Sequence, residues 1–134
     1  MALVTEVGTI SGSDPELRFT SSGKAVCNFD IYIPAVRANP EKGIAGEEKR
    51  YRKVTAWEQL GENAAESLRQ GDRVIVRGTL KCNKWEGQDG QPKEREELTA
   101  WNIGPDLSYA TAEVVRNERE EASAPAAPGY EKPF

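Results

Sequence analysis

Cationic, aromatic and small polar side chains are concentrated in the stretch KRYRKVTAW, residues 49–57. Its aromatic and β-branched content favours a strand, and side chains alternate between the two faces of a strand. One face would carry Lys49, Tyr51, Lys53, Thr55 and Trp57, and the other Arg50, Arg52, Val54 and Ala56. Positive charges interleaved with flat rings suit the phosphates and unpaired bases of a nucleic acid. The alternative is a solvated edge strand with Trp57 tucked into a core.

A second strand of similar composition is expected over residues 72–85. Alternation predicts an inward row of Val74, Val76, Gly78, Leu80 and Cys82, and an outward row of Arg73, Ile75, Arg77, Thr79, Lys81, Asn83 and Trp85. The outward row repeats the cations, the hydroxyl group and the terminal aromatic ring of the first stretch. Two such faces in one small domain favour a binding surface more strongly than one face does.

The composition narrows the function classes. With 134 residues, the chain can form one domain and a tail, and its net charge of −4 argues against simple bulk attraction to nucleic acid. Histidine is absent, and the two cysteines, Cys27 and Cys82, cannot form a closed zinc site alone. No acidic cluster has metal-ligand spacing, so we expect no cofactor and disfavour a hydrolase or nuclease. We see neither a secretory signal nor a membrane span, and free thiols are typical of a cytoplasmic protein.

The first third of the chain reads as short strands. Residues 2–11 predict a strand that bends at a bulge near Gly8, residues 13–15 a turn, and residues 16–20 a short strand. The clearest strand spans residues 24–33, and its core face is expected to comprise Cys27, Phe29, Ile31 and Ile33. Pro34 ends it. Residues 34–48 predict a long irregular loop from which Arg37 or Lys42 could reach a ligand, unless both are solvated.

One helix and a last strand complete the pattern. Leu60, Ala64, Ala65 and Leu68 form a helical stripe within residues 58–70, and Gly71 is placed for a helix C-cap. An Asp-Gly hairpin signal lies in residues 88–91, followed by a strand over 95–103. Trp101, near the end of that strand, is expected in the core or at a subunit interface. Cys27 is expected to be a buried apolar residue.

Five strands with one helix between the third and fourth is the order of an OB-fold barrel. We therefore predict an all-β OB-fold domain over residues 1–110. From about Thr111 the composition becomes charged and then small and Pro-rich, which cannot bury enough apolar surface to fold. Residues 111–134 are predicted to be a flexible acidic tail ending in Pro133 and Phe134.

The same segments resemble the bacterial and phage single-stranded DNA-binding protein family. The matching pieces are VGTI at 7–10, DPELRF at 14–19, GKAVCNF at 23–29, GDRVIVRGTL at 71–80, NKW at 83–85 and DGQ at 89–91. They fall in the family's order across residues 3–104. The resemblance implies an OB-fold that binds single-stranded DNA without strong sequence preference during replication, recombination and repair, and no enzymatic activity.

The resemblance also implies roles for individual residues. Tyr51, Trp57 and Trp85 correspond to family positions that stack on bases, whereas a fourth aromatic position falls near Arg37, whose guanidinium can also stack. The cations expected to meet phosphates are Lys24, Lys53, Arg73, Arg77, Lys81 and Lys84. Tyr32 would stack or lie in a subunit interface.

Partners follow from the resemblance as well. Family members usually form homotetramers in the cytoplasm, on the nucleoid, and recruit replication and repair proteins through an acidic tip that ends in Pro-Phe. Pro133 and Phe134 match that ending, although Glu131 and Lys132 replace the usual aspartates. The alternative function is an OB-fold adaptor of the replisome or primosome that acts mainly through protein contacts. Such an adaptor would not need the two stacking rows.

Overall fold

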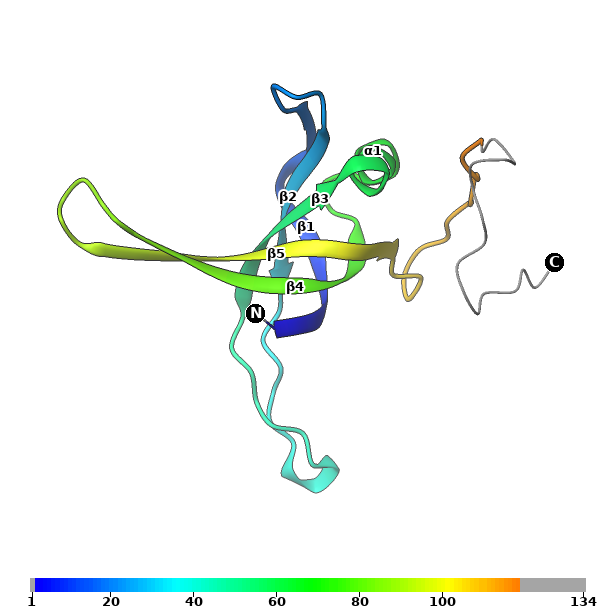
Figure 1. The fold of residues 1–134 in the computed structure, drawn as a ribbon. Coiled ribbons are helices and arrows are strands. Elements are labelled where there is room, and N and C mark those ends of the chain that lie inside the picture. The colour runs from blue at the N-terminus through cyan, green and yellow to red at the C-terminus, as the bar shows by residue number, and fades with distance from the viewer. Residues whose placement is uncertain (1, 119–134) are drawn as a thin grey trace.

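Five strands and one helix form the barrel in the computed structural model, which describes residues 2–118 (Figure 1). The elements are β1 (Ala2–Phe19), β2 (Ala25–Ile33), β3 (Arg50–Trp57), α1 (Glu58–Ser67), β4 (Arg73–Glu86) and β5 (Pro92–Pro105). The strands close in the order β1-β2-β3-β5-β4. All neighbours are antiparallel except β3 and β5, which pair in parallel over three residues each. The predicted OB-fold barrel with one short helix is confirmed.

The core fills the barrel with the inward residues that alternation predicted on three strands. Its fully buried side chains include Cys27 and Ile31 from β2, Val54 and Ala56 from β3, and Val74 and Val76 from β4. The cluster also includes Ala64 and Leu68, while Leu60 and Ala65 pack against it from the same helical stripe. Burial raises the pKa of the Cys27 thiol. Cys27 is therefore the inert apolar residue that was expected.

The N-terminal segment corrects the sequence interpretation. β1 is one strand of 18 residues instead of two short strands with a turn between them. Its register on β2 shifts between Ser11 and Glu16, so Asp14 and Pro15 lie in an irregularity that the strand passes through. Gly12 supplies a positive φ of 86° there. The turn residues therefore bend the strand without ending it.

Two strand glycines, Gly8 with its predicted bulge and Gly78 of the inward row, have different roles in the barrel. At Gly8 the register with β4 is unbroken, so the predicted bulge is absent from this position. A Cβ there would lie 2.7 Å from the Tyr32 carbonyl oxygen, so close strand approach requires glycine. At Gly78 the β4–β5 register does shift, and a Cβ would lie 2.1 Å from the Thr99 carbonyl oxygen. Gly78 therefore marks the bend that closes the barrel.

The helix is shorter than predicted. It ends at Ser67, and Leu68 is already extended at φ −111° and ψ 147°, so Gly71 is not its C-cap. Leu68 enters the core. Gly71 lies in the turn that follows the helix and donates its N–H to the carbonyl of Ile10 on β1. At the other end, Glu58 has a φ of 59°, which a non-glycine residue rarely adopts. This bend lets the chain pass directly from β3 into α1.

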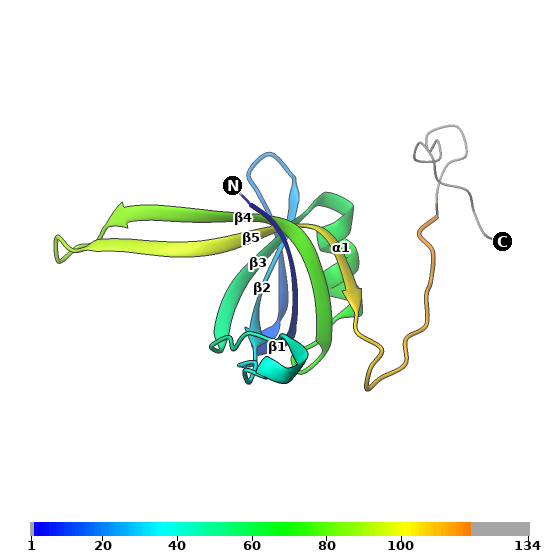
Figure 2. The same cartoon turned by 90° about the horizontal axis from the view of Figure 1, so that it is seen from below.

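The β4–β5 hairpin extends beyond the barrel as an arm, which we call the hairpin arm (residues 81–97). Both figures show it leaving on the side opposite α1 (Figures 1 and 2). Cys82 lies on this arm and is exposed, so its predicted inward position is wrong. Strand alternation continues along the arm, but past Leu80 there is no longer a core for the inward row to enter.

Two further segments leave the barrel. Residues 34–49 project as a loop that contains the short 3₁₀ helix η1 (Pro40–Lys42) and isolated bridges Val36–Glu47 and Asn39–Ile44 (Figure 1). After β5, residues 106–118 continue on the side of α1, without a helix or strand in this described part (Figure 2). Asn63 of α1 donates its side-chain N–H to Asn117 at 2.8 Å.

Candidate nucleic-acid interface

Strand register brings the predicted rows of β3 and β4 onto one outer face, which we call the binding face. Lys53 pairs with Asp30 on β2 and with Glu97 on β5, and Glu97 pairs with Lys81 on β4. Two residues further along each strand, a second row of paired residues crosses the same four strands through Asn28, Thr55, Thr99 and Thr79. Residues two or four apart on a strand share its face. The face therefore includes Tyr51 and Trp57 from β3 and Trp85 from β4.

The three aromatic rings are exposed and spread along this face. Tyr51, Trp57 and Trp85 are 62%, 42% and 49% exposed, so none of them is a core residue. β3 and β4 run in opposite directions, so Trp57 and Trp85 lie at opposite ends of the face, separated by about 26 Å along the strands at 3.3 Å per residue. The Tyr51 ring lies between them and packs on Tyr32, with ring centroids 5.2 Å apart.

The cations of the face differ in whether a carboxylate already holds them. Lys53 Nζ lies 3.9 Å from a Glu97 carboxylate oxygen. By contrast, Lys81 and Arg95 form no ion pair or hydrogen bond with side chains of residues 2–118. Unpaired exposed cations can bind a phosphate without breaking an existing contact. The hairpin arm therefore carries the most available positive charge of this face.

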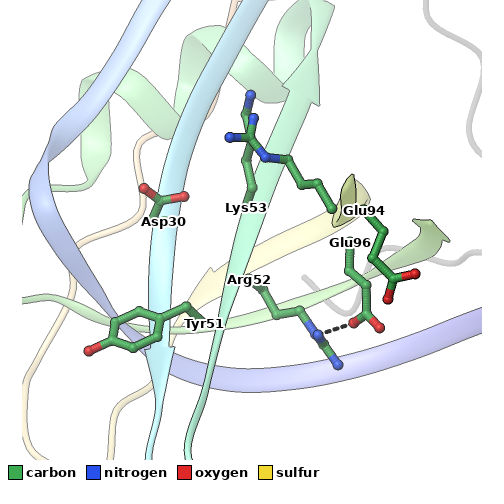
Figure 3. Close-up of a pocket in the computed structure, with 7 residues that line it drawn as sticks. Asp30, Tyr51, Arg52, Lys53, Glu94 and Glu96 are labelled. Atoms are coloured by element: carbon green, nitrogen blue, oxygen red, sulfur yellow. Dashed lines mark hydrogen bonds and ion pairs between the residues drawn. The ribbon is translucent and has the colours of Figure 1, made fainter. Parts of the chain in front are cut away.

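The other face of β3 is structural. Arg50 donates two hydrogen bonds, at 3.1 and 3.2 Å, to Glu6, the one charged residue buried within residues 2–118. This contact with Glu6 raises the pKa of the Arg50 guanidinium. Arg52 pairs with Glu96 of β5 and lies 3.8 Å from Glu6 (Figure 3). These arginines link β1, β3 and β5 through ion pairs with carboxylates.

A hollow of about 640 Å³ opens where the barrel meets the hairpin arm. Its lining comes from β2, β3 and β5 and comprises Asp30, Tyr51, Arg52, Lys53, Glu94, Arg95 and Glu96. In Figure 3 the Arg52–Glu96 pair lies on one side, and Asp30 lies near Tyr51 on the other. Charges of both signs therefore surround an exposed ring, which differs from a uniformly basic groove.

Arg73 and Arg77 lie on the barrel part of β4, away from the arm. Arg73 donates to Asp106 at 2.7 Å and has its guanidinium carbon 5.9 Å from the Tyr109 ring centroid. Hydrogen bonds from Ser108, and then the one from Arg73, lower the pKa of the Asp106 carboxyl group. Arg73 is thus held at the exit of the chain from β5 and is not brought together with Lys53 and Lys81.

Trp101 is exposed in the described chain, so the core half of its prediction is wrong, while a subunit-interface position stays a prediction. Its ring is 54% exposed, and the Arg77 guanidinium lies 5.6 Å from its centroid. Arg77 pairs with Asn102 and Gly78 with Ala100, which leaves Trp101 as the extra residue of a bulge. Buried Leu98 and Ala100 on either side of Thr99 already indicate by alternation that position 101 faces outward.

The remaining predicted contacts are dispersed. Lys24 is exposed at the β1–β2 turn, and Arg37 is exposed on the projecting loop. Lys84 is exposed on the hairpin arm but faces away from its neighbour Trp85, because adjacent strand residues point to opposite faces. Pro133 and Phe134 lie outside the described residues. Sequence reasoning missed Arg95 and Asp30, because their positions on the face depend on register between strands.

Residues 2–118 contain no cluster of three or more acidic or cysteine side chains that could hold a metal ion. No helix in that range is long and apolar enough to cross a membrane.

Comparison with known proteins identifies the fold's relatives. Residues 2–105 match the model of the single-strand binding protein family. The chain is 41% identical over 117 residues to the single-stranded DNA-binding protein of Paenarthrobacter aurescens, covering 87% of this chain and 68% of that one. It is 40% identical to the protein of the same name from Mycobacterium leprae, covering 87% and 69% of the two chains.

A solved structure agrees with these sequence relatives. The crystal structure of the small single-stranded DNA-binding protein from Streptomyces coelicolor superposes with a TM-score of 0.65 at 27% identity, covering 80% of this chain and 95% of that chain. The match extends through all five strands of the barrel, which carry the exposed rings and the cations of the binding face. The chain therefore belongs to the single-strand binding protein family.

Proposed function

We propose that this protein binds single-stranded DNA, without strong sequence preference, along the binding face. The observation that carries the proposal is that the exposed rings Tyr51, Trp57 and Trp85 share one face with Lys81 and Arg95, which have no ionic partner within residues 2–118. Exposed aromatic rings stack on bases whose faces are free, and the cations meet the phosphates between them. Family membership and the names of its relatives support the same function.

The proposal assigns residues by their surroundings. Tyr51, Trp57 and Trp85 stack on bases, and Trp101 extends the row on the barrel side of the face. The phosphate contacts are Lys53, Lys81 and Arg95 on the face, with Lys24, Arg37, Arg77 and Lys84 around it. Arg73 is the weakest of the predicted contacts, because Asp106 already holds its guanidinium. The protein acts by binding and has no catalytic step.

The proposal extends to the rest of the chain through the family resemblance. Residues 1–110 form the DNA-binding domain, and residues 111–134 form an acidic tail whose terminal Pro133 and Phe134 dock on replication and repair proteins. The protein functions as a homotetramer on the nucleoid in the cytoplasm, in replication, recombination and repair. The exposed rings support DNA binding over a purely protein-binding adaptor, which would leave them without a partner.

Tryptophan fluorescence tests the binding function directly. Unlabelled oligo(dT) should quench the emission of the exposed tryptophans, because a stacked base contacts the indole ring. The same oligonucleotide annealed to its complement should quench far less at equal salt, since its bases are already stacked and paired. Equal affinity for the single strand and the duplex would refute the proposal.

A further inference from the structure

The binding face includes a free carboxylate beside one of its stacking rings. Asp30 is exposed and forms no ion pair or hydrogen bond with the side chains of the described residues. Its cross-strand partner is Lys53, whose ammonium group instead lies 3.9 Å from Glu97 on the other side. A carboxylate on a DNA-binding surface repels phosphates. If bound DNA contacts Asp30, it must therefore do so through a group other than a phosphate.

Asp30 lies one register step from Tyr51 across the β2–β3 pair, because Tyr51 is opposite Tyr32 and Lys53 is opposite Asp30. Such diagonal neighbours lie about 7–8 Å apart, and their Cβ atoms somewhat less, within reach of long or aromatic groups. Figure 3 shows the Asp30 carboxylate and the Tyr51 ring on the same side of the two strands. A base stacked on Tyr51 can thus present its hydrogen-bonding edge to Asp30.

The surroundings fit a single nucleotide. The hollow that both residues line has a volume of about 640 Å³, inside the range of roughly 300–1,000 Å³ that holds small ligands. Tyr32 packs against Tyr51 and limits how far that ring can turn. Lys53 and Arg95 also line the hollow, so they are placed to hold the phosphates of the bound nucleotide. Ring, carboxylate and cations therefore meet at one position.

An ionised carboxylate only accepts hydrogen bonds, so it discriminates among bases. Guanine presents two adjacent donors on its Watson–Crick edge, the N1–H and the N2 amino group, which match the two oxygens of a carboxylate. Cytosine and adenine each offer one amino donor. Thymine offers its single N–H between two carbonyl oxygens, which a carboxylate repels. Single-stranded bases are read on this edge because it is unpaired.

We infer that Asp30 and Tyr51 form a base-selective pocket that prefers guanine and disfavours thymine within an otherwise nonselective DNA path. This inference rests on the proposed function. A bound DNA strand would take the position along the path that places a guanine in the pocket. Glu94 also lines the hollow, and no described residue pairs with its carboxylate, but it is opposite Lys84 on the other face of the hairpin arm and is not beside Tyr51.

The test compares three labelled oligonucleotides of equal length. The first is oligo(dT), the second carries guanine at every fourth position, and the third carries inosine there, which lacks the N2 amino group. A well-formed bidentate base contact is worth about 1–3 kcal/mol, and for this exposed pair we expect the lower end, about a fivefold preference for the guanine oligonucleotide. The inosine oligonucleotide should lose most of that preference, although it keeps a purine ring at the same positions.

The variants assign the effect. Asp30→Asn should abolish the guanine preference while binding oligo(dT) at least as tightly, because a negative charge is removed. Glu94→Gln and the helix variant Glu62→Gln also lose one exposed negative charge and should keep the preference. Equal binding of the three oligonucleotides, an unchanged ratio in Asp30→Asn, or loss of the ratio in Glu94→Gln would each overturn the inference. If no oligonucleotide bound at all, the proposed function would fail with it, whereas equal binding leaves that function intact.

Discussion

Three cations of β3 and β4 carry the same charge but should contribute differently to the salt dependence of DNA binding. Lys81 has no ionic partner within residues 2–118, Lys53 lies 3.9 Å from Glu97, and Arg73 is bonded to Asp106 at 2.7 Å. A cation that contacts a phosphate releases a counterion from the DNA. A cation already neutralised by a carboxylate must first exchange that partner.

The magnitudes follow from this difference. Each phosphate contact on a single strand contributes about 0.7 to the slope of log affinity against log salt, so Lys81→Ala should flatten the slope by about that amount. Between about 50 and 200 mM salt, the intact protein should then lose about 2.6-fold more affinity than this variant. Lys53→Ala should flatten the slope less, and Arg73→Gln should leave it nearly unchanged.

Fluorescence titration of labelled oligo(dT) at several salt concentrations measures the three slopes. Thermal melting of each variant provides the control, because Arg73→Gln removes an ion pair that holds β4 to the chain after β5. An unchanged slope for Lys81→Ala would show that Lys81 is an ordinary solvated surface residue that contacts no phosphate. Equal slope changes for all three variants would show that existing ion pairs do not limit phosphate contact.

Three variants and one thiol reagent test the fold and the stacking row. Trp57→Ala and Trp85→Ala should each weaken oligo(dT) binding by about 1–3 kcal/mol with little change in melting temperature, as measured by titration and thermal melting, because both rings are exposed; loss of stability with normal binding would instead show a structural role. Gly78→Ala should destabilise the barrel by several kcal/mol, on the order of 3, in denaturant unfolding, because its Cβ would lie 2.1 Å from a backbone oxygen; an unchanged midpoint would contradict this. Iodoacetamide should modify one thiol in the native protein, Cys82, and two after unfolding, because Cys27 is buried with a raised pKa; mass spectrometry counts the adducts, and native labelling of Cys27 would contradict its burial.

Alternation of side chains predicted the faces of β2, β3 and β4 correctly, because a strand that borders a core has a strict period of two. Alternation could not show where the core ends. Cys82 keeps the inward parity of Val74 and Val76 but lies on the hairpin arm beyond the barrel. The turn signals near Pro15 predict the end of a strand, yet an irregularity in the register accommodates them within β1.

The composition of the binding face was only partly predictable. Alternation within β3 placed Tyr51 and Trp57 on one face, and alternation within β4 placed Trp85 on an outward face, while the family resemblance implied that the three rings stack on bases. Asp30 and Arg95 became visible only when register placed them beside those strands. The Arg73–Asp106 pair joins residues 33 positions apart, so no local pattern reveals that this cation is already neutralised.

The barrel has one short seam. β3 and β5 are joined over only Lys53–Thr55 and Glu97–Thr99, whereas every other pair of neighbouring strands is joined over at least seven residue pairs. Local opening begins where the fewest contacts must break, so this seam is the natural weak point of the closed sheet. It also lies under the proposed DNA path. A DNA strand that contacts both β3 and β4 would span the seam and hold it closed. Bound DNA would then stabilise the barrel itself, and the DNA-bound protein would resist unfolding more than the free protein.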